Sequence, residues 1–268
     1  MQILVTGGTG HLGRDIVRLL KDQDHQVRVL ARTPGSDPAI EWIEGDLATG
    51  RGVTEAVSGM EVIVHAATFS PAARRGTIRP VDLVRSPPEV DIGSTRQLLG
   101  AAGQGGVAHF LYVSIAGVKH ARMPYSRLKA AAEDLVRHSG VPHSIVPATQ
   151  FYWLVDRMLG KMARLPVWPL PTKLAMQPVD EGDFAAYVVE CVADGPGGDR
   201  PSFCGPEVMS FGDVAERYQA ARRLQRRILP IPLPQAAGRA VGDLTCPDGR
   251  RGTTTWAEWL SRHPAGTD

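Results

Sequence analysis

The chain has 268 residues, of which 43% are hydrophobic and 22% are charged. This composition is typical of a globular protein and excludes a disordered or fibrous chain. The 30 basic and 28 acidic residues leave a net charge of +2, which is too close to neutral to indicate a nucleic-acid partner. Because no apolar run is long enough for a membrane span and no signal-peptide pattern opens the chain, we expect a cytoplasmic protein without a membrane partner.

The three cysteines show no pattern of a disulfide framework or of a metal site. Cys191, Cys204 and Cys246 are odd in number and lie far apart in the sequence, whereas disulfide frameworks use even sets and metal sites use closely spaced pairs. We therefore expect buried or incidental thiols and no bound metal.

The first thirteen residues, MQILVTGGTGHLG, contain an apolar strand at 3–5 that runs directly into three glycines. Gly7 lets the chain leave the strand in a conformation that a Cβ would forbid, Gly10 lets a pyrophosphate approach the main chain, and Gly13 lets the next helix pack close to the sheet. The amides at that helix N-terminus would then face the phosphates. This turn predicts dinucleotide binding by Gly7, Thr9, Gly10, His11, Leu12 and Gly13.

Beyond the turn, apolar strands alternate with amphipathic helices as far as residue 150. We expect strands at 25–31, 40–43, 61–65, 109–113 and 143–146, and helices at 52–58, 97–102 and 125–137. This alternation predicts an α/β protein with a Rossmann-type doubly wound parallel sheet. The segment 69–88 is rich in Pro and Arg and lacks periodicity, so we expect a long loop beside the ligand crevice.

The pattern changes after residue 150, where four prolines between 166 and 178 divide the chain into short pieces. Capped helices are expected at 184–192 and 214–224. We divide the chain into a dinucleotide-binding domain at 1–150 and a small C-terminal substrate-binding region at 151–268, with 179–193 packing back on the first domain.

An aromatic run, Phe151, Tyr152 and Trp153, directly follows the sixth expected strand. Ligands bind at the carboxyl ends of the strands in such sheets. We therefore expect these residues to line the substrate site, the alternative being that they only join the C-terminal region to the sheet.

Arg32 stands where the second strand ends, 19 residues after Gly13. NAD-selective folds place an acidic residue there to bond the adenosine ribose. A guanidinium instead suits a 2′-phosphate, to which it donates in a fork geometry. The sequence therefore favours NADP(H) over NAD(H); the alternative is a solvated arginine at a strand edge, with Arg28 nearby.

The ends of the third and fourth strands supply further candidate contacts. Asp46 follows the third strand, where its carboxylate can accept from the adenine amino group while Leu47 covers the ring; a turn aspartate that caps the next helix is the alternative. The small residues after the fourth strand would let a cofactor pass over the strand end, although tight packing would also explain them. We expect Ala66, Ala67 and Thr68 to contact the cofactor.

Tyr125 and Lys129 lie four residues apart on an expected helix, so their side chains project from one face. A nearby cation stabilises phenolate and lowers the pKa of the tyrosine toward working pH. Such a phenol can protonate a carbonyl oxygen while the cofactor delivers hydride. Ser114, just past the expected fifth strand, could hydrogen-bond the same carbonyl or only satisfy backbone groups. Catalytic roles are therefore expected for Tyr125, Lys129 and Ser114.

Together these residues resemble the short-chain dehydrogenase/reductase superfamily, and more closely its atypical NmrA-like and sugar-epimerase-like branch. The resemblance covers essentially the whole chain and extends to 147–150, 179–183 and 204–207. It implies a Rossmann fold, NADP(H) at the glycine turn and Pro147 among the cofactor contacts. Extended members place the catalytic Ser or Thr one or two residues after Ser114, and many NmrA-like relatives lack the Tyr/Lys pair and act as redox sensors.

We therefore expect an NADPH-dependent oxidoreductase that reduces a small apolar or aromatic carbonyl or quinone compound, as a monomer or a homodimer. One alternative is a regulatory protein that senses the NADP(H) redox state. A nucleotide-sugar epimerase or dehydratase is a further alternative, although the C-terminal part lacks an evident diphosphate clamp. The basic run at 217–227 is interpreted as a solvated helix end rather than a nucleic-acid site.

Overall fold

The computed structural model describes residues 1–67, 89–118, 123–233 and 243–264. The first strands are β1 (Gln2–Thr6), β2 (Gln26–Ala31), β3 (Glu41–Glu44), β4 (Val62–His65), β5 (His109–Ile115) and β6 (His143–Ala148). Three short strands follow at the edge of the same sheet, β9 (Gly198–Asp199), β10 (Phe203–Cys204) and β13 (Arg250–Arg251). The expected loop at 69–88 lies outside the described residues.

The sheet confirms the expected doubly wound fold. Its strand order is β13-β10-β6-β5-β4-β1-β2-β3, with β9 also beside β6, and its described pairs are parallel. Within it the order is 3-2-1-4-5-6, so successive strands are added in one direction from β1 to β3 and in the other direction from β4 onward. Such a switch point, between β1 and β4, opens a crevice at the carboxyl ends of the strands. The glycine turn leaves β1 at this point.

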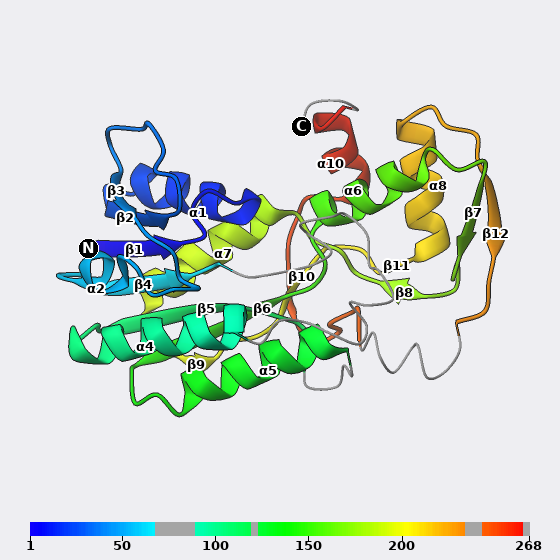
Figure 1. Cartoon of the computed structure of the whole chain (residues 1–268). Coiled ribbons are helices and arrows are strands. Elements are labelled where there is room, and N and C mark those ends of the chain that lie inside the picture. Colours follow the sequence, from blue (N-terminus) through cyan, green and yellow to red (C-terminus); the bar gives the residue numbers. More distant parts are fainter. Residues whose placement is uncertain (68–88, 119–122, 234–242, 265–268) are drawn as a thin grey trace.

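Helices cover both faces of the sheet (Figure 1). They are α1 (His11–Asp22), α2 (Val53–Val57), α4 (Ser94–Gln104), α5 (Pro124–Arg137) and α7 (Glu181–Asp194), and a π-helical turn, η2 (Glu89–Gly93), leads into α4. The helices α1 and α7 pack on one face, and α2, α4 and α5 pack on the other. Strand alternation explains this division, because Ile3 and Val5 point to the first face whereas Leu4 points to the second.

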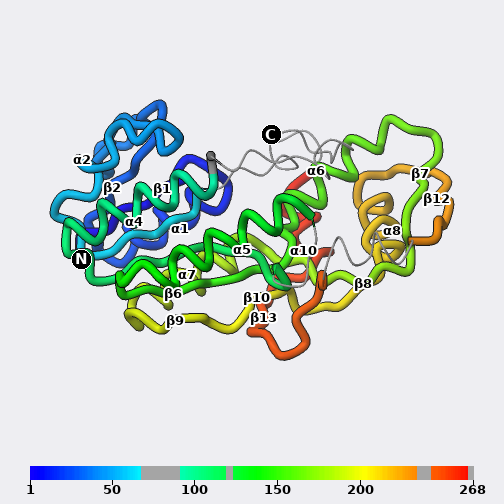
Figure 2. Tube along the Cα trace, turned by 60° about the horizontal axis from the view of Figure 1, so that its bottom comes forward, coloured from blue at the N-terminus to red at the C-terminus, as the bar shows by residue number. Residues whose placement is uncertain are grey.

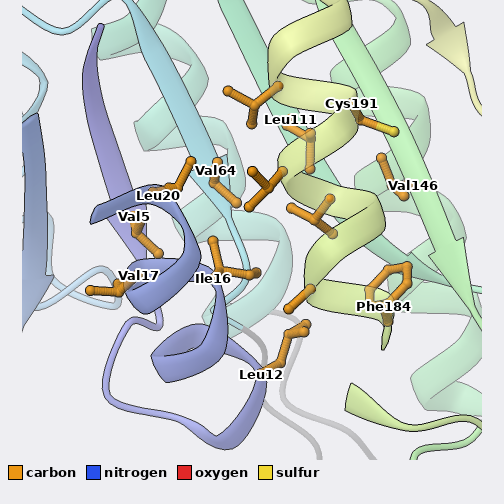
Figure 3. Packing of buried hydrophobic residues seen from close by; sticks show 14 of the residues in the cluster. Val5, Leu12, Ile16, Val17, Leu20, Val64, Leu111, Val146, Phe184 and Cys191 are labelled. Atoms are coloured by element: carbon orange, nitrogen blue, oxygen red, sulfur yellow. The ribbon is translucent and has the colours of Figure 1, made fainter. Parts of the chain in front are cut away.

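The contact of α1 with α7 builds the larger core (Figure 3). Leu12, Ile16 and Leu20 recur at helical spacing on α1 and are buried against the sheet and α7. Phe184, from α7, is fully buried in the same cluster. A helix that lies beyond residue 150 in sequence is therefore part of the packing around the glycine turn.

The N-terminus of α7 is fixed by two carboxylates. Asp180 caps the helix by accepting from the backbone N–H of Asp183 at 2.9 Å. Asp183 in turn accepts from the backbone N–H groups of Thr253 and Thr254, at 2.6 and 2.8 Å. These bonds tie the C-terminal segment to the helix that covers the sheet.

The remaining elements form a separate core at the other end of the molecule. They are α6 (Tyr152–Met162), β7 (Val167–Leu170), β8 (Ala175–Met176), β11 (Met209–Ser210), α8 (Phe211–Ala221), β12 (Arg227–Pro230) and α10 (Trp256–Arg262). Aromatic side chains dominate this core, and Tyr152, Trp168 and Trp256 are completely buried in it. We propose to keep the boundary near residue 150 as a division between these two cores.

The expectation of three unpaired thiols was wrong for two of the cysteines. Cys204 and Cys246 form a disulfide across 42 residues, with their Cα atoms 6.3 Å apart, whereas Cys191 is a free buried thiol. Residue 246 is brought beside β10 by Gln177, whose side chain donates to the Gly205 carbonyl and accepts from the Cys246 N–H. This proximity is a property of the fold and is not visible in cysteine spacing.

Candidate functional site

The glycine turn has the shape that its sequence predicts. Gly7 has a positive φ of +79°, and a Cβ on it would lie 2.7 Å from the backbone nitrogen of Ala67. A Cβ on Gly13 would lie only 2.0 Å from the Gly7 carbonyl oxygen. The turn is therefore closed against the end of β4, and no larger side chain fits at either position.

The start of α1 offers N–H groups for an anion. Gly10 is the N-cap and supplies no side-chain cap. Within the described part of the chain, the backbone N–H groups of Leu12 and Gly13 have no acceptor. The N–H of the next residue, Arg14, donates to the Gly10 carbonyl at 3.0 Å. Such amides at a helix N-terminus bind phosphate. Thr9 is exposed on the same turn.

The two arginines near the end of β2 have different environments. Arg28 is bound to the Glu41 carboxylate at 2.8 Å and donates to the carbonyl of Ser58 at 2.7 Å, so its guanidinium is already engaged. Arg32 is exposed directly after β2, and it forms no ion pair among the residues that the structure describes. Arg32 is thus the guanidinium available to a ligand.

Asp46 and Leu47 follow β3 in a tight turn. The Oδ1 atom of Asp46 accepts from the Ala48 backbone N–H at 2.9 Å within this turn, but Asp46 does not cap the next helix, because the N-cap of α2 is Gly52. Leu47 is half-buried and packs against the α2 side of the core.

The small residues after β4 lie against the glycine turn. Ala66 donates its backbone N–H to the Thr6 carbonyl at 3.1 Å, and Ala67 is the nearest neighbour of Gly7. The expected contact Thr68 lies outside the described residues. The two main chains are therefore in close contact here, which requires glycine at position 7.

Lys129 is buried beneath the carboxyl end of the sheet, with 2% of its surface exposed. Its Nζ donates to the Val113 carbonyl at 2.9 Å and lies 4.3 Å from the centre of the Tyr112 ring. Burial lowers the pKa of Lys129 to about 8, although the carboxylates of Asp91 and Glu133 oppose this shift. Tyr125 lies one turn earlier on α5 and is half-exposed, on the same side of the helix.

A buried histidine lies next to Lys129. The Nδ1 of His65 is 2.7 Å from the Thr6 hydroxyl, and its Nε2 is 3.1 Å from the Thr95 hydroxyl. Burial and the charge of Lys129 lower the pKa of His65 to about 3, so the ring is neutral. Because Thr95 donates to the Asp91 carbonyl at 2.7 Å, it accepts from Nε2–H, and Nδ1 accepts from Thr6. This series of hydrogen bonds links the end of β1 to η2.

Ser114 belongs to β5, which runs to Ile115 rather than ending at 113. Its hydroxyl donates to Glu133 Oε1 at 2.5 Å, and the other oxygen of Glu133 is bound to Arg137 at 2.8 Å. Ser114 is 3% exposed. The hydroxyl proton is therefore engaged with Glu133, two turns of helix away from Tyr125.

The sequence interpretation overlooked Asp91 and Glu133 as neighbours of Lys129. The position of Glu133, four residues after Lys129 and eight after Tyr125, would have placed all three on one helix face. Pro147, which pairs in register with Ser114, lines a pocket on this side of the sheet together with Glu133 and Arg137.

The aromatic run at 151–153 divides into three environments. Phe151 packs against Phe184, with ring centres 5.7 Å apart, and Tyr152 is buried in the C-terminal core, where its hydroxyl donates to the Thr254 carbonyl at 3.1 Å. Trp153 instead stacks on His11 of the glycine turn, with ring centres 4.5 Å apart and planes 12° from parallel. Among these three, Trp153 is the residue that reaches the turn.

Glu181 supports Trp153 from the first turn of α7. Burial raises the pKa of Glu181 to about 8; its own backbone N–H and, to a smaller extent, the backbone N–H of Trp153 oppose this shift. In the described part of the chain, Glu181 Oε2 and the Trp153 indole N–H are buried without a hydrogen-bond partner. Two buried polar groups beside the glycine turn thus lack a partner among the described residues.

The described residues contain no group of three or more His, Cys, Asp or Glu side chains placed to hold a metal ion. Among the described helices, none has the length and apolar character needed to cross a bilayer.

Sequence comparison matches the chain to known proteins over its first two thirds. A family model described as NAD(P)H-binding matches residues 7–195. The photosystem II assembly factor Ycf39 of Cyanophora paradoxa is 28% identical over 200 residues, which are 70% of this chain and 58% of that protein. A ceramide reductase of Caulobacter vibrioides is 31% identical over 199 residues, which are 70% of this chain and 59% of that protein. The matches thus span less than two thirds of these relatives' own length.

Structural comparison supports the fold over nearly the whole chain. The NADPH-dependent quinone oxidoreductase of Escherichia coli, solved in complex with NADPH, superposes with a TM-score of 0.76 at 15% identity, over 97% of this chain and 99% of that one. At this identity the likeness concerns the fold.

Proposed function

Because the chain belongs to the NAD(P)H-binding family and has the Rossmann-type fold of NAD(P)-dependent oxidoreductases, we propose that it is an NADPH-dependent reductase of a small apolar or aromatic carbonyl or quinone compound. The observation that supports catalysis is the buried Lys129, one helical turn from Tyr125, at the carboxyl end of β5. A strongly shifted pKa in a crevice is characteristic of a catalytic group.

The residues present fit the cofactor. The glycine turn leaves backbone N–H groups for the pyrophosphate, and Arg32 is available for a 2′-phosphate. When bound, NADPH supplies the hydride equivalent. The preference for NADPH over NADH rests on Arg32 and is part of this proposal.

The protein side of the reaction follows from Tyr125 and Lys129. The Tyr125 hydroxyl donates its proton to the substrate oxygen as negative charge builds on it, and the Lys129 ammonium stabilises the phenolate that remains. We place Ser114 in a supporting role, because its proton is held by Glu133. Trp153 and Glu181, which border the turn, are proposed to contact the substrate.

Tyr125→Phe tests this mechanism, because it removes one hydroxyl and keeps the ring. Oxidation of NADPH is measured with a panel of quinones and aromatic ketones. Turnover is expected to fall about 10²-fold or more, while folding and NADPH affinity change little.

If the variant keeps nearly the full rate on a substrate of the wild type, Tyr125 is not the acid. If no substrate is found and NADPH and NADP⁺ bind with different affinities, the protein is a redox sensor instead of a reductase.

A further inference from the structure

The strands β7 and β12 form a parallel ribbon at the end of the molecule opposite α2 (Figures 1 and 2). We call the exposed surface of this ribbon and its flanks, residues 161–173 and 223–233, the ribbon face. Five of the seven large hydrophobic side chains that are exposed in the described residues lie here, and they are Leu165, Val167, Leu229, Ile231 and Leu233. Clustered exposed apolar residues mark an interaction site, whereas scattered ones do not.

The strand geometry fixes these side chains outward. Trp168 and Leu170 alternate with Val167 along β7 and are buried in the C-terminal core. In the register of the ribbon, Arg227 pairs with Val167 and Leu229 pairs with Pro169. Because the inward positions are filled by the core, these outward residues cannot be buried by rotation of the strand.

The charge of the ribbon face has one sign. Its segments, 161–173 and 223–233, contain no acidic residue. Their exposed cations are Lys161, Arg164, Lys173, Arg223, Arg226 and Arg227. Within the described chain none of these six is in an ion pair, whereas the neighbouring Arg222 is bound to Asp156 at 2.6 Å.

The main chain at the end of the ribbon has few unsatisfied donors. Pro230 and Pro232 lack an N–H, and the Ile231 N–H between them donates to the Leu170 carbonyl at 2.9 Å. Absent or bonded N–H groups lower the cost of moving a segment into an apolar medium, because an unsatisfied donor makes such a transfer unfavourable. This property suits residues 230–232 to the edge of a lipid layer.

We propose that the ribbon face docks on the surface of an anionic lipid bilayer. The aliphatic side chains would enter the boundary between headgroups and acyl chains, and the flanking cations would bind lipid phosphates and carboxylates. A single-stranded nucleic acid fits less well, because the described face has aliphatic and proline residues rather than exposed aromatic rings for stacking. A two-fold contact with a second copy would oppose cations to cations.

Sedimentation of the full chain with vesicles tests the proposal, and neither cofactor nor substrate is added. We expect binding to phosphatidylcholine vesicles that contain phosphatidylserine and little binding to phosphatidylcholine alone. Arg164→Gln and Arg227→Gln should each lower the partition coefficient about fivefold at low salt. Leu229→Ser combined with Ile231→Ser should lower it at low and at high salt, whereas Arg18→Gln, an exposed arginine of α1, serves as the control.

The outcomes separate the possible partners. Equal binding to both kinds of vesicle, absence of binding, or ribbon variants that bind like the wild type would overturn the proposal, provided that thermal melting shows the variants folded. A change of oligomeric state in the same variants, without vesicle binding, would assign the face to a second copy. Loss of vesicle binding on addition of an oligonucleotide, with direct binding of that oligonucleotide, would assign it to nucleic acid.

Discussion

The glycine turn and the C-terminal core differ in how their polar groups are satisfied. In the C-terminal core, the Tyr152 hydroxyl and the Trp256 indole N–H both donate to backbone carbonyls, of Thr254 and Val214. The indole N–H groups of Trp168 and Trp259 are enclosed in the same core without a partner among the described residues. Around the turn, backbone N–H groups, Arg32 and Glu181 Oε2 lack such partners within the described residues. The groups at the turn include the amides of a helix N-terminus and an exposed guanidinium, which a ligand can reach, whereas those of the C-terminal core are enclosed. Substitutions in the two regions should therefore have different effects.

Gly13→Ala should have the largest effect. The new Cβ would overlap the Gly7 carbonyl, which is backbone and cannot move aside. We expect the free energy of unfolding to fall by about 3 kcal/mol and NADPH binding to be lost. Gly100→Ala is the control, since a Cβ there meets nothing within 4 Å on α4; denaturant unfolding and calorimetric titration measure both. A Gly13 variant with normal NADPH affinity would remove the turn from the cofactor site.

Lys129→Met should change how stability depends on pH. The pKa of Lys129 is lowered to about 8 in the folded protein, so between this value and its ordinary pKa the unfolded chain binds more protons. Lys129 therefore contributes a rise of about 2 kcal/mol in the free energy of unfolding of the wild type between roughly pH 7.5 and 9.5. The variant should lack this rise. Urea unfolding at both pH values is the measurement, and identical slopes would show that Lys129 is not desolvated.

Arg32→Ala should weaken NADPH binding selectively. Loss of the hydrogen bonds between the guanidinium and the phosphate costs about 1.5–3 kcal/mol of binding free energy. This corresponds to a roughly tenfold to hundredfold lower affinity for NADPH. Affinity for NADH should barely change. Arg18→Ala, in an exposed pair with Asp22 on α1, is the control for the loss of one positive charge. An equal loss for both cofactors in a titration would contradict the assignment.

Substitutions at the neighbours Tyr152 and Trp153 compare the two regions most directly. Tyr152 lies in the C-terminal core, whereas Trp153 contacts the glycine turn. Tyr152→Phe should lower the free energy of unfolding by about 1 kcal/mol through the lost bond to Thr254, without affecting ligands. Trp153→Leu should instead change substrate KM, since its ring stacks on His11. If both variants affect only stability, the aromatic run joins the C-terminal region to the sheet and does not line the site.

The sequence alone predicted the parallel sheet and its glycine turn, because these depend on local signals. Apolar strands, helical spacing and the glycine positions are read within windows of a dozen residues. The helix α6 was missed, although Tyr152, Val155 and Leu159 recur at helical spacing and are buried. Aromatic residues and the prolines that follow obscured that pattern.

Features that depend on distant segments were less predictable. The sequence placed Arg28 near Arg32 without showing that it is engaged, and its ion pair follows from β3 lying beside β2, which brings Glu41 to Arg28. The engagement of Ser114 with Glu133 and the Cys204–Cys246 disulfide likewise require the packing of α5 and the sheet edge. Local patterns cannot report such pairings.

The return of α7 to the sheet limits how the chain can be divided for engineering. A fragment that stops at residue 150 would lack Phe184 and the rest of the helix that covers α1, and would expose the larger core. The C-terminal region is inserted around this helix, at 152–178 and again after 205. A chimera that exchanges substrate regions between relatives should therefore keep 179–204 with its own glycine turn, together with Cys246, β13 and the segment that bonds Asp183.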